Sequence, residues 1–442
     1  MTDRKNPDPR SDIMSSHGML SMVSETRPGE VGTAILLTLN VFLLLLAYYL
    51  LKVAREPLIL VGGGGAEVKS YASAGQAVLL IFVAYGYGAI ARRVNRLRLI
   101  SIVTLFYVSN LVLFALLASR DVPIGVPFFI WVGIFNVTMI AAQFWAFAAD
   151  IYDEERGKRM FPILGIGSSL GAVVGAEVGR HAKTLPPPIL MLIAAGLLVI
   201  CVILTAAVHN REGRRTEDKT ANQPLAGAAS GFSLLLKDRY LLLMGAFILI
   251  YNWVNTTGEF VLDKTLLAAA AGQGNPEEFV QAFKGKYFGY VNIIGLALQV
   301  LVVSRVIRHL GVRAALFVMP LVSLASYTTL AIAPVLSIVF AAKVAENSLD
   351  YSLQNTARQA LWLVTTRDAK YKAKQVIDTF LQRAGDVMSA ALVGVGTLLS
   401  LGVKGFAAAN VGLVLAWFGV LIYLAREHKK RSHEHAAAAQ KP

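Results

Sequence analysis

Long apolar runs separated by short polar stretches fill most of this chain, and they constrain its fold more than any other feature. A helix needs roughly 20 mostly apolar residues to cross a bilayer, because lipid offers no partner for backbone N–H and C=O groups. Charged residues make up only 16% of the sequence, whereas a soluble globular domain carries about 25%. The sequence therefore predicts an all-α integral membrane protein with about 12 transmembrane helices. The predicted spans are residues 34–54, 71–91, 99–119, 124–150, 160–180, 187–208, 239–262, 286–307, 312–333, 335–362, 376–401 and 404–425.

Basic residues gather in alternate gaps between these spans. They lie in residues 92–98, 156–159, 211–219, 305–313, 367–374 and 426–431. Loops rich in Lys and Arg stay on the cytoplasmic side, so we expect both termini there, in the inner membrane of a bacterium. The loop after the seventh span is expected to hold Lys264, Lys284 and Lys286. Because the charge of +14 follows this topology, it does not indicate a nucleic-acid partner.

A polar segment, followed by an Ala/Gly/Ser-rich one, divides the series of spans in the middle. Two halves of six helices around a central site are typical of the major facilitator architecture. The predicted organisation is a cytoplasmic tail at 1–33, a first half at 34–208, a linker at 209–236, a second half at 237–426 and a basic tail at 427–442.

The sequence gives little sign of a leader, a metal or a cofactor. The first 33 residues are polar, and no signal peptide is evident. Cys201 is the single cysteine and lies in an apolar run, and the histidines show no metal-ligand spacing. We therefore expect no metal and no cofactor. No nucleophile and base stand out as a pair, so an enzyme is not expected.

Ionisable residues inside the predicted spans are the candidate functional residues. Such groups are expensive in hydrocarbon, so they face a cavity or a partner. The substrate-binding candidates are Lys52, Arg55, Glu259, Lys343 and Arg358. The coupling or gating candidates are Glu56, Asp150, Glu346, Asp350, Arg383 and Asp386.

Two interpretations of these charges stay open at this point. In the first, they line a polar central cavity whose cations attract an anionic substrate. In the second, Lys343 pairs with Glu346 or Asn347 on its own helix face, while Arg55 and Glu56 lie at the membrane interface. Arg383 and Asp386 would form an ion pair between helix bundles in either case.

Glycines recur every fourth residue in the fifth span, at Gly167, Gly171, Gly175 and Gly179. Small residues on one helix face allow a second helix to approach closely. We expect this stripe to pack between the two halves. It is not a phosphate-binding loop, because the Lys-Ser/Thr ending of that motif is absent.

Four stretches of the sequence resemble one family of transporters, the ATP/ADP translocases of plastids and obligate intracellular bacteria. The stretch YYLLKVAREPLILVGGGGAEVK, residues 48–69, is similar to the family's first span. Residues 144–175 resemble its FW-x-FAN stretch, and residues 240–264 resemble its seventh span with a glutamate at Glu259. Residues 352–386 follow its late segment without a gap, with matches at Lys370, Lys372, Lys374, Asp378, Arg383 and Gly385.

The resemblance implies a major-facilitator-like nucleotide transporter that exchanges ATP for ADP or carries related nucleotides. It implies roles for Arg55, Glu259 and Arg358. The chain departs from the family pattern at three places: the first-span lysine is Arg55, a Lys-Glu pair reads Arg358-Gln359, and a late lysine is Asp386.

We therefore expect a secondary transporter that works by alternating access on nucleotides or a related phosphorylated anion. The alternative is a proton-coupled facilitator of another solute, in which Glu346, Asp350 and Asp386 hold protons or cations. A third hypothesis is a membrane sensor without transport. The expected partners are the lipid bilayer and a small anionic solute, and the sequence leaves the oligomeric state open.

Overall fold

In the computed structural model, the described part of the chain is helical. It covers residues 31–91, 94, 96–152, 154–212, 228–366 and 369–439. The predicted tail before Val31, the middle of the predicted linker and the basic residues Arg92, Arg93 and Arg367 lie outside the described residues. An all-α architecture was predicted, and it is confirmed for the described residues.

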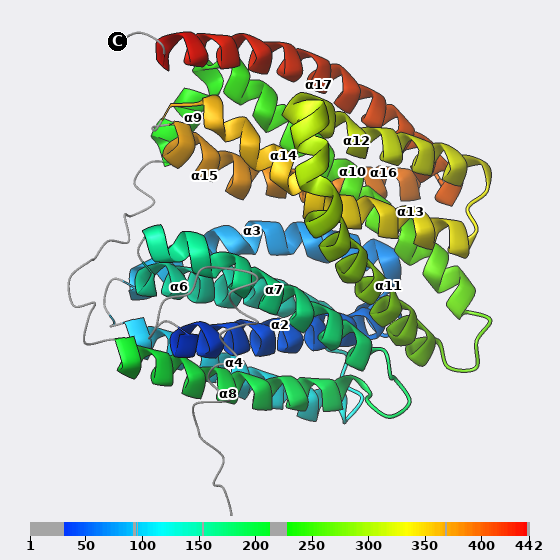
Figure 1. Ribbon diagram of the computed structural model, residues 1–442. Helices are drawn as coiled ribbons and strands as arrows, with labels where there is room; N and C mark the ends of the chain where they lie inside the picture. Colours follow the sequence, from blue (N-terminus) through cyan, green and yellow to red (C-terminus); the bar gives the residue numbers. More distant parts are fainter. Residues whose placement is uncertain are drawn as a thin grey trace, which may run out of the picture.

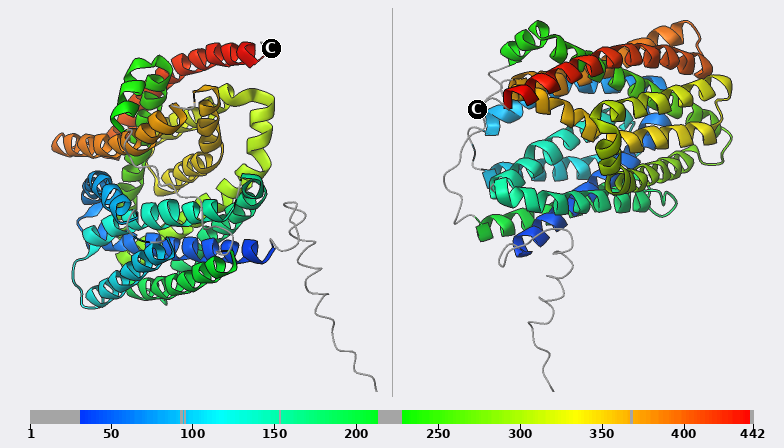
Figure 2. Two further views of the ribbon diagram at one scale, coloured as in Figure 1. Left: turned by 90° about the vertical axis from the view of Figure 1, so that its left-hand side faces the viewer. Right: turned by 45° about the horizontal axis from the view of Figure 1, so that its top comes forward.

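The helices form two layers, one above the other in Figure 1. The two further views keep the same two groups apart (Figure 2). The first group contains α2 (Val31–Leu60), α3 (Gly65–Ala91), α4 (Arg96–Ala118), α5 (Gly125–Phe135), the π-helix η1 (Asn136–Trp145), α6 (Ala146–Ile151), α7 (Glu154–Gly179) and α8 (Pro187–Glu212).

The second group follows the segment that lies outside the described residues. It contains α9 (Ala228–Lys237), α10 (Arg239–Ala270), α11 (Pro276–Leu298), η2 (Gln299–Val303), α12 (Ser304–Ile332), α13 (Leu336–Leu349), η3 (Asp350–Gln354), α14 (Asn355–Ala360), η4 (Leu361–Val364), η5 (Ala369–Ala373), α15 (Lys374–Val376), η6 (Ile377–Leu381), α16 (Gln382–Leu398) and α17 (Val403–Ala439). The helix α11 crosses from this group to the first one (Figure 1).

Local sequence signals explain several of the helix boundaries. The carboxylate of Asp238 accepts hydrogen bonds from the backbone N–H groups of Tyr240 and Leu241, and so caps α10. Asn275 caps α11 in the same way, and Pro276 occupies its first position. Gly311 has a φ of 77°, a conformation that glycine adopts readily, and it turns the chain within α12. This turn lies at the gap expected between the spans 286–307 and 312–333.

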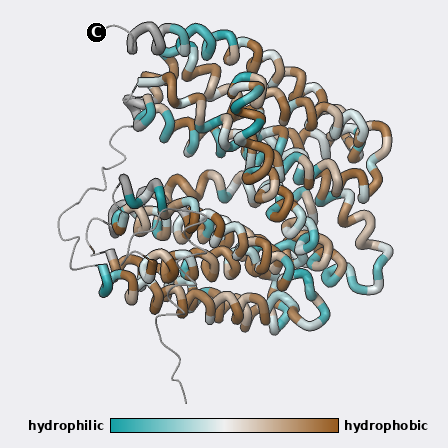
Figure 3. The backbone as a smooth tube through the Cα atoms, viewed as in Figure 1, coloured by the Kyte–Doolittle hydropathy of each residue, from teal (hydrophilic) through white to brown (hydrophobic). Residues whose placement is uncertain are grey.

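Eight of the helical segments in the described residues are long and apolar enough to cross a membrane. One of them runs from residue 276 to residue 332 and contains the turn at Gly311. Hydrophobic residues dominate the helix bodies, and polar residues gather toward their ends (Figure 3). Three helical segments that overlap predicted spans are not among these eight: α3, the run α13–α14, and α16. Charged residues of the site described below lower the mean hydropathy of the run α13–α14 and of α16.

Several predicted boundaries differ from the helices. The linker expected at 209–236 is narrower, because α8 extends to Glu212 and α9 begins at Ala228. The expected basic tail from residue 427 continues α17 as far as Ala439. The first span continues through Pro57 to Leu60, because a helix accommodates one proline by giving up a single backbone hydrogen bond.

The glycine stripe of α7 packs against α2, inside the first group. A side-chain carbon placed at Gly175 would lie 2.6 Å from the carbonyl oxygen of Leu46, and one at Gly167 would lie 2.6 Å from Cγ2 of Thr38. The expectation of close packing is therefore correct, but the expectation that it joins the two halves is wrong. The stripe fixes two neighbouring helices within one group.

Candidate functional site

Four charged side chains from four helices meet where the two helix groups join. Glu56 of α2 accepts a hydrogen bond from Lys69 of α3 at 2.5 Å and lies 3.6 Å from Lys284 of α11. Asp263 of α10 pairs with Lys69 at 2.8 Å and with Lys284. The side chains of Glu56 and Lys284 are fully buried. We call these four residues the junction cluster. It joins the two helix groups through two positive and two negative charges.

A second cluster lies beside it in the second helix group. Lys343 of α13 is fully buried, donates to the side-chain oxygen of Asn255 at 2.9 Å and pairs with Glu346 at 3.1 Å. Glu259 of α10 lies 3.7 Å from Lys343 and 4.0 Å from Lys284. The second cluster therefore continues the junction cluster through Glu259.

Glu259 differs from its neighbours in its exposure. Its carboxylate accepts hydrogen bonds from Tyr287 and Asn347, both at 2.8 Å. Even so, its side chain is 27% exposed, whereas that of Lys343 is 0% exposed. A partly exposed carboxylate in the middle of a long apolar helix faces water-accessible space. Glu259 is therefore positioned to meet a solute that enters between the helix groups.

Arg55 and Lys52 lie one helical turn apart on α2 but have different partners. Arg55 pairs with Glu56 at 3.0 Å, and its guanidinium lies 4.5 Å from the ring centre of Phe129. The ammonium of Lys52 lies 4.2 Å from the ring centre of Phe288 on α11. Within the described residues, Lys52 has no hydrogen bond or ion pair, although Glu259 and Glu56 lie in electrostatic range.

The remaining candidates occupy other parts of the second helix group. Asp350 lies in electrostatic range of Arg358 and beside the Tyr251 hydroxyl. Arg383 pairs with Asp386 at 3.4 Å, one turn along the same helix. Asp386 also accepts hydrogen bonds from Asn252 and Thr256, at 2.8 Å each. The Arg383–Asp386 pair therefore lies within one helix rather than between bundles, which corrects that expectation.

The structure decides between the two interpretations for some residues and not for others. Lys343 pairs with Glu346 on its own helix, as the second interpretation held. Arg55 and Glu56 belong to a buried network rather than to a membrane interface, so that part of the second interpretation is wrong. The side chains of Lys52 and Glu259 are both partly exposed. Asp150 is exposed and lies in α6, which is at the left in Figure 1, whereas α11, the helix of Lys284, is at the lower right.

Three of the four junction residues, Lys69, Asp263 and Lys284, are not among the site candidates that the sequence suggested. Lys284 was expected in a loop, but it lies in α11 and is fully buried. The signal that could have placed it was the start of α11, where Asn275 and Pro276 precede Glu277 and Glu278. A helix that begins there carries Lys284 two turns inward.

Further contacts between the helix groups gather at the same end of the molecule. The hydroxyl of Tyr49 donates to the side chain of Asn292 at 3.0 Å. Gln281 donates to the backbone oxygens of Gly179 and Leu185, at 2.8 Å each. Gln281 lies near the start of α11 and Gly179 ends α7, whereas Tyr49 and Asn292 lie in the second halves of α2 and α11. In the expected topology, the end of α7 and the start of α11 face away from the cytoplasm.

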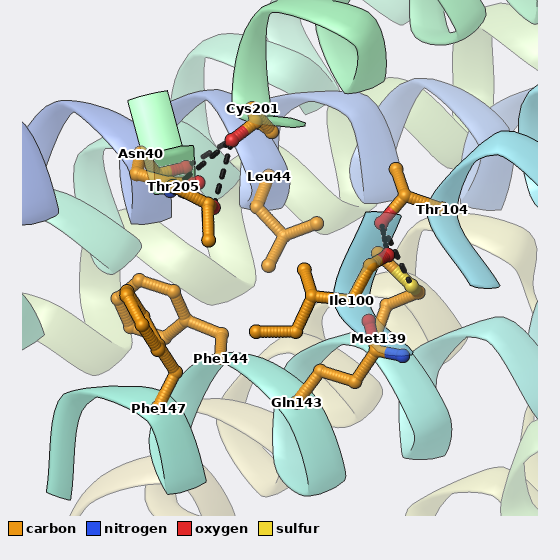
Figure 4. Close-up of a pocket in the computed structure, with 10 residues that line it drawn as sticks. All are labelled: Asn40, Leu44, Ile100, Thr104, Met139, Gln143, Phe144, Phe147, Cys201 and Thr205. Carbon is orange, nitrogen blue, oxygen red and sulfur yellow. Dashed lines mark hydrogen bonds between the residues drawn. The ribbon is translucent and has the colours of Figure 1, made fainter. Parts of the chain in front are cut away.

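Two cavities lie outside the central site. One has a volume of about 20 Å³ within the first helix group, with Asn40, Cys201 and Thr205 hydrogen-bonded together on one side (Figure 4). It has room for about one water molecule, so it is too small for a nucleotide. The other has a volume of about 500 Å³ between the loop at 180–184 and residues 273–282, outside the junction cluster.

The solved structures similar to this chain are membrane transporters. The nucleoside transporter NupG aligns with a TM-score of 0.68 and 10% identity, over 88% of this chain and 98% of that chain. A bacterial homologue of the iron transporter ferroportin, in an inward-facing state, aligns with a TM-score of 0.64 and 13% identity, over 89% and 99%. At these identities, the likeness establishes the fold alone. The chain has the major-facilitator-like fold of a multi-pass membrane protein.

Sequence comparison indicates a narrower relationship. Residues 126–328 match the model of the TLC ATP/ADP transporter family. ADP,ATP carrier protein 1 of Chlamydia trachomatis is 20% identical over 339 residues, which are 66% of this chain and 62% of that protein. Its counterpart in Chlamydia pneumoniae is 21% identical over 342 residues, 67% and 65% respectively. The matched segment contains Glu259, Asp263 and Lys284. Over residues 126–328 the chain is therefore similar to the ATP/ADP transporter family, and it is a distant relative of these carrier proteins.

Proposed function

We propose that this protein is a secondary transporter that moves a nucleotide or a related phosphorylated anion across the inner membrane by alternating access. The observation that carries the proposal is Lys52, a cation without an acidic partner among the described residues, at the junction of the two helix groups. An unpaired charge in a membrane interior is expensive, so it marks a substrate or ion pathway. A negatively charged substrate would complete the pairing.

We further propose twelve spans in two halves, with both termini in the cytoplasm. The eight apolar segments become twelve when the segment 276–332 is divided at Gly311 and α3, α13–α14 and α16 are added. The three added segments carry part of the site's charge, including Lys69, Lys343 and Asp386, and a helix that lines a polar path needs less lipid-facing surface. The basic loops support the orientation.

The residues divide into two roles in this proposal. Lys52 and Arg55 face the substrate's negative charge, and Glu259, Lys343 and Arg358 complete the binding site. Glu56 and the rest of the junction cluster close the outer side of the path while the inner side is open. Release of the cluster would let the two groups rock about the central site. Glu346, Asp350, Arg383, Asp386 and Asp150 belong to coupling or gating.

Uptake by proteoliposomes tests the proposal. Vesicles preloaded with unlabelled nucleotide should take up labelled nucleotide, and empty vesicles should not. Lys52→Gln should reduce this counterflow at least roughly tenfold, the effect of losing about one charge interaction at a partly solvated site. Lys286→Gln is the matched control, because Lys286 is an exposed lysine two residues after Lys284 on α11. Uptake that follows a proton gradient and ignores internal nucleotide would instead support the proton-coupled alternative.

A further inference from the structure

The ammonium of Lys52 lies against aromatic rings rather than beside a carboxylate. It is 4.2 Å from the ring centre of Phe288 on α11 and 5.1 Å from that of Tyr49, one turn earlier on α2. The Lys52 side chain is partly exposed. In the part of the chain that the structure describes it forms no ion pair, although Glu259 and Glu56 lie in electrostatic range.

An aromatic ring stabilises a cation without occupying its hydrogen-bond donors. The negative face of the ring attracts the charge, and the three N–H groups of an ammonium stay available to acceptors. The carboxylate of Asp263, which pairs with Lys69 and Lys284 in the junction cluster, instead takes up donors of those ammonium groups. A cation held by a ring is therefore stabilised in place and still able to bind an anion.

The ring of Phe288 is itself fixed by packing. Its side chain is buried, and it meets the ring of Tyr49 edge to face, with centres 6.2 Å apart. The Tyr49 hydroxyl donates to the side chain of Asn292, one helical turn further along α11, at 3.0 Å. Phe288 therefore cannot turn away from α2 without losing these contacts.

The contact between Lys52 and Phe288 joins the two helix groups. Lys52 belongs to α2 in the first group, and Phe288 belongs to α11 in the second, one helical turn beyond Lys284. The ring therefore lies beside Lys52 in the arrangement in which the junction cluster is formed. A lysine side chain loses rotamer freedom when a ligand fixes it, and an existing contact with a ring reduces that cost of binding.

We propose that Phe288 is a positioning residue for substrate binding: its ring holds the Lys52 ammonium in place for a negatively charged substrate. This inference rests on the proposed function and adds to the binding site a residue of the second helix group. Lys52 contacts the substrate, and Phe288 acts through Lys52. The strength of such a contact depends on the electron density of the ring face, so a change in that density should change the affinity for the substrate.

The test replaces Phe288 with phenylalanines that carry one, two or three ring fluorines, in the full chain reconstituted in proteoliposomes. Fluorine withdraws electron density from the ring face and leaves the shape of the ring nearly unchanged. We expect the half-saturating concentration of nucleotide in counterflow to rise with each fluorine, roughly threefold to thirtyfold in total, while the maximal rate changes little. The same series at Phe283, a ring of α11 that packs against Phe340, should leave that concentration unchanged.

A second measurement separates positioning from a structural role. Phe288→Leu removes the ring face and should raise the half-saturating concentration as much as the most fluorinated ring does. In a Lys52→Gln protein, whose residual counterflow has no ammonium for the ring to hold, Phe288→Leu should add no further change. A further rise of several fold there would show that Phe288 does not act through Lys52, and it would overturn the inference.

The outcomes distinguish this inference from the proposed function. Counterflow that is present but does not respond to fluorination at Phe288 would refute the positioning role and leave the transporter proposal standing. Absence of counterflow in the unsubstituted protein, with melting that shows it to be folded, would refute both.

Discussion

Helix α2 makes two contacts of opposite kinds. Along one face, the glycines of α7 bring backbone against backbone, with no polar partner and no space for an added methyl group at Gly175. Near its end, Glu56 meets Lys69 and Lys284 in the junction cluster. A close-packed glycine contact depends on exact fit and does not readily separate. Ion pairs can exchange their partners for water or for a charged solute. Helix α2 is therefore firmly packed within the first helix group, and its attachment to the second group depends on ion pairs that can be exchanged.

The largest expected effect concerns the junction cluster. Asp263→Asn removes a carboxylate that pairs with both Lys69 and Lys284, and it leaves Lys284 buried with less compensation. Breaking a buried pair in this way costs about 3–5 kcal/mol. Thermal unfolding in detergent should show a clear drop in melting temperature.

The matched control for that change is Glu67→Gln. Glu67 also joins the two helix groups, by a 2.8 Å pair with Lys264, but both side chains are about 30% exposed. Exposed pairs contribute about 0–1 kcal/mol. Equal losses in the two variants would show that burial of the junction cluster contributes nothing to the attachment of the groups.

A smaller loss is expected on the glycine face of α2. Gly175→Ala places a methyl group 2.6 Å from the Leu46 carbonyl oxygen and so forces α7 away from α2. Overpacking of this kind costs about 1–3 kcal/mol. Gly165→Ala is the control, because a methyl group there meets nothing within 4 Å. If Gly175→Ala melts like Gly165→Ala, the contact between α2 and α7 is not close-packed.

The smallest effect on stability is expected at Lys52. Its ammonium has ring contacts but no ion pair within the described residues, so Lys52→Gln removes a poorly compensated charge. We expect a melting temperature that is unchanged or slightly raised, together with the loss of counterflow described above. A loss of several kcal/mol in the Lys52→Gln protein would show that Lys52 is a structural residue and would remove the observation that carries the proposed function.

Much of the fold could be predicted from the sequence, because the hydrophobic requirement of a membrane helix is local. Each predicted span overlaps a helix or a continuous helical run. The gap expected before residue 312 coincides with the turn at Gly311. The helix boundaries were less accurate at residues 276–286, where charged residues extend the helix beyond its apolar part.

The site was only partly predictable. Glu56 and Arg55 were recognised because charges stand out in an apolar run, but Lys69 and Lys284 were not chosen as site residues. Lys284 contacts Glu56 across more than 200 positions of sequence, and no local pattern records that contact. Lys52 and Arg55 are both basic residues of the same apolar run, yet among the described residues Arg55 pairs with a carboxylate and Lys52 does not.

The sequence by itself determined where helices form, which residues are too polar to face lipid and where two helices can approach closely. These properties depend on neighbouring residues along one chain segment. The tertiary structure alone decided which charges pair with each other and that Lys52 lies against an aromatic ring without an ion pair in the described part of the chain. Pairing depends on how the helices rotate and cross. A small rotation of a helix moves the end of a lysine or arginine side chain from a carboxylate to an aromatic ring.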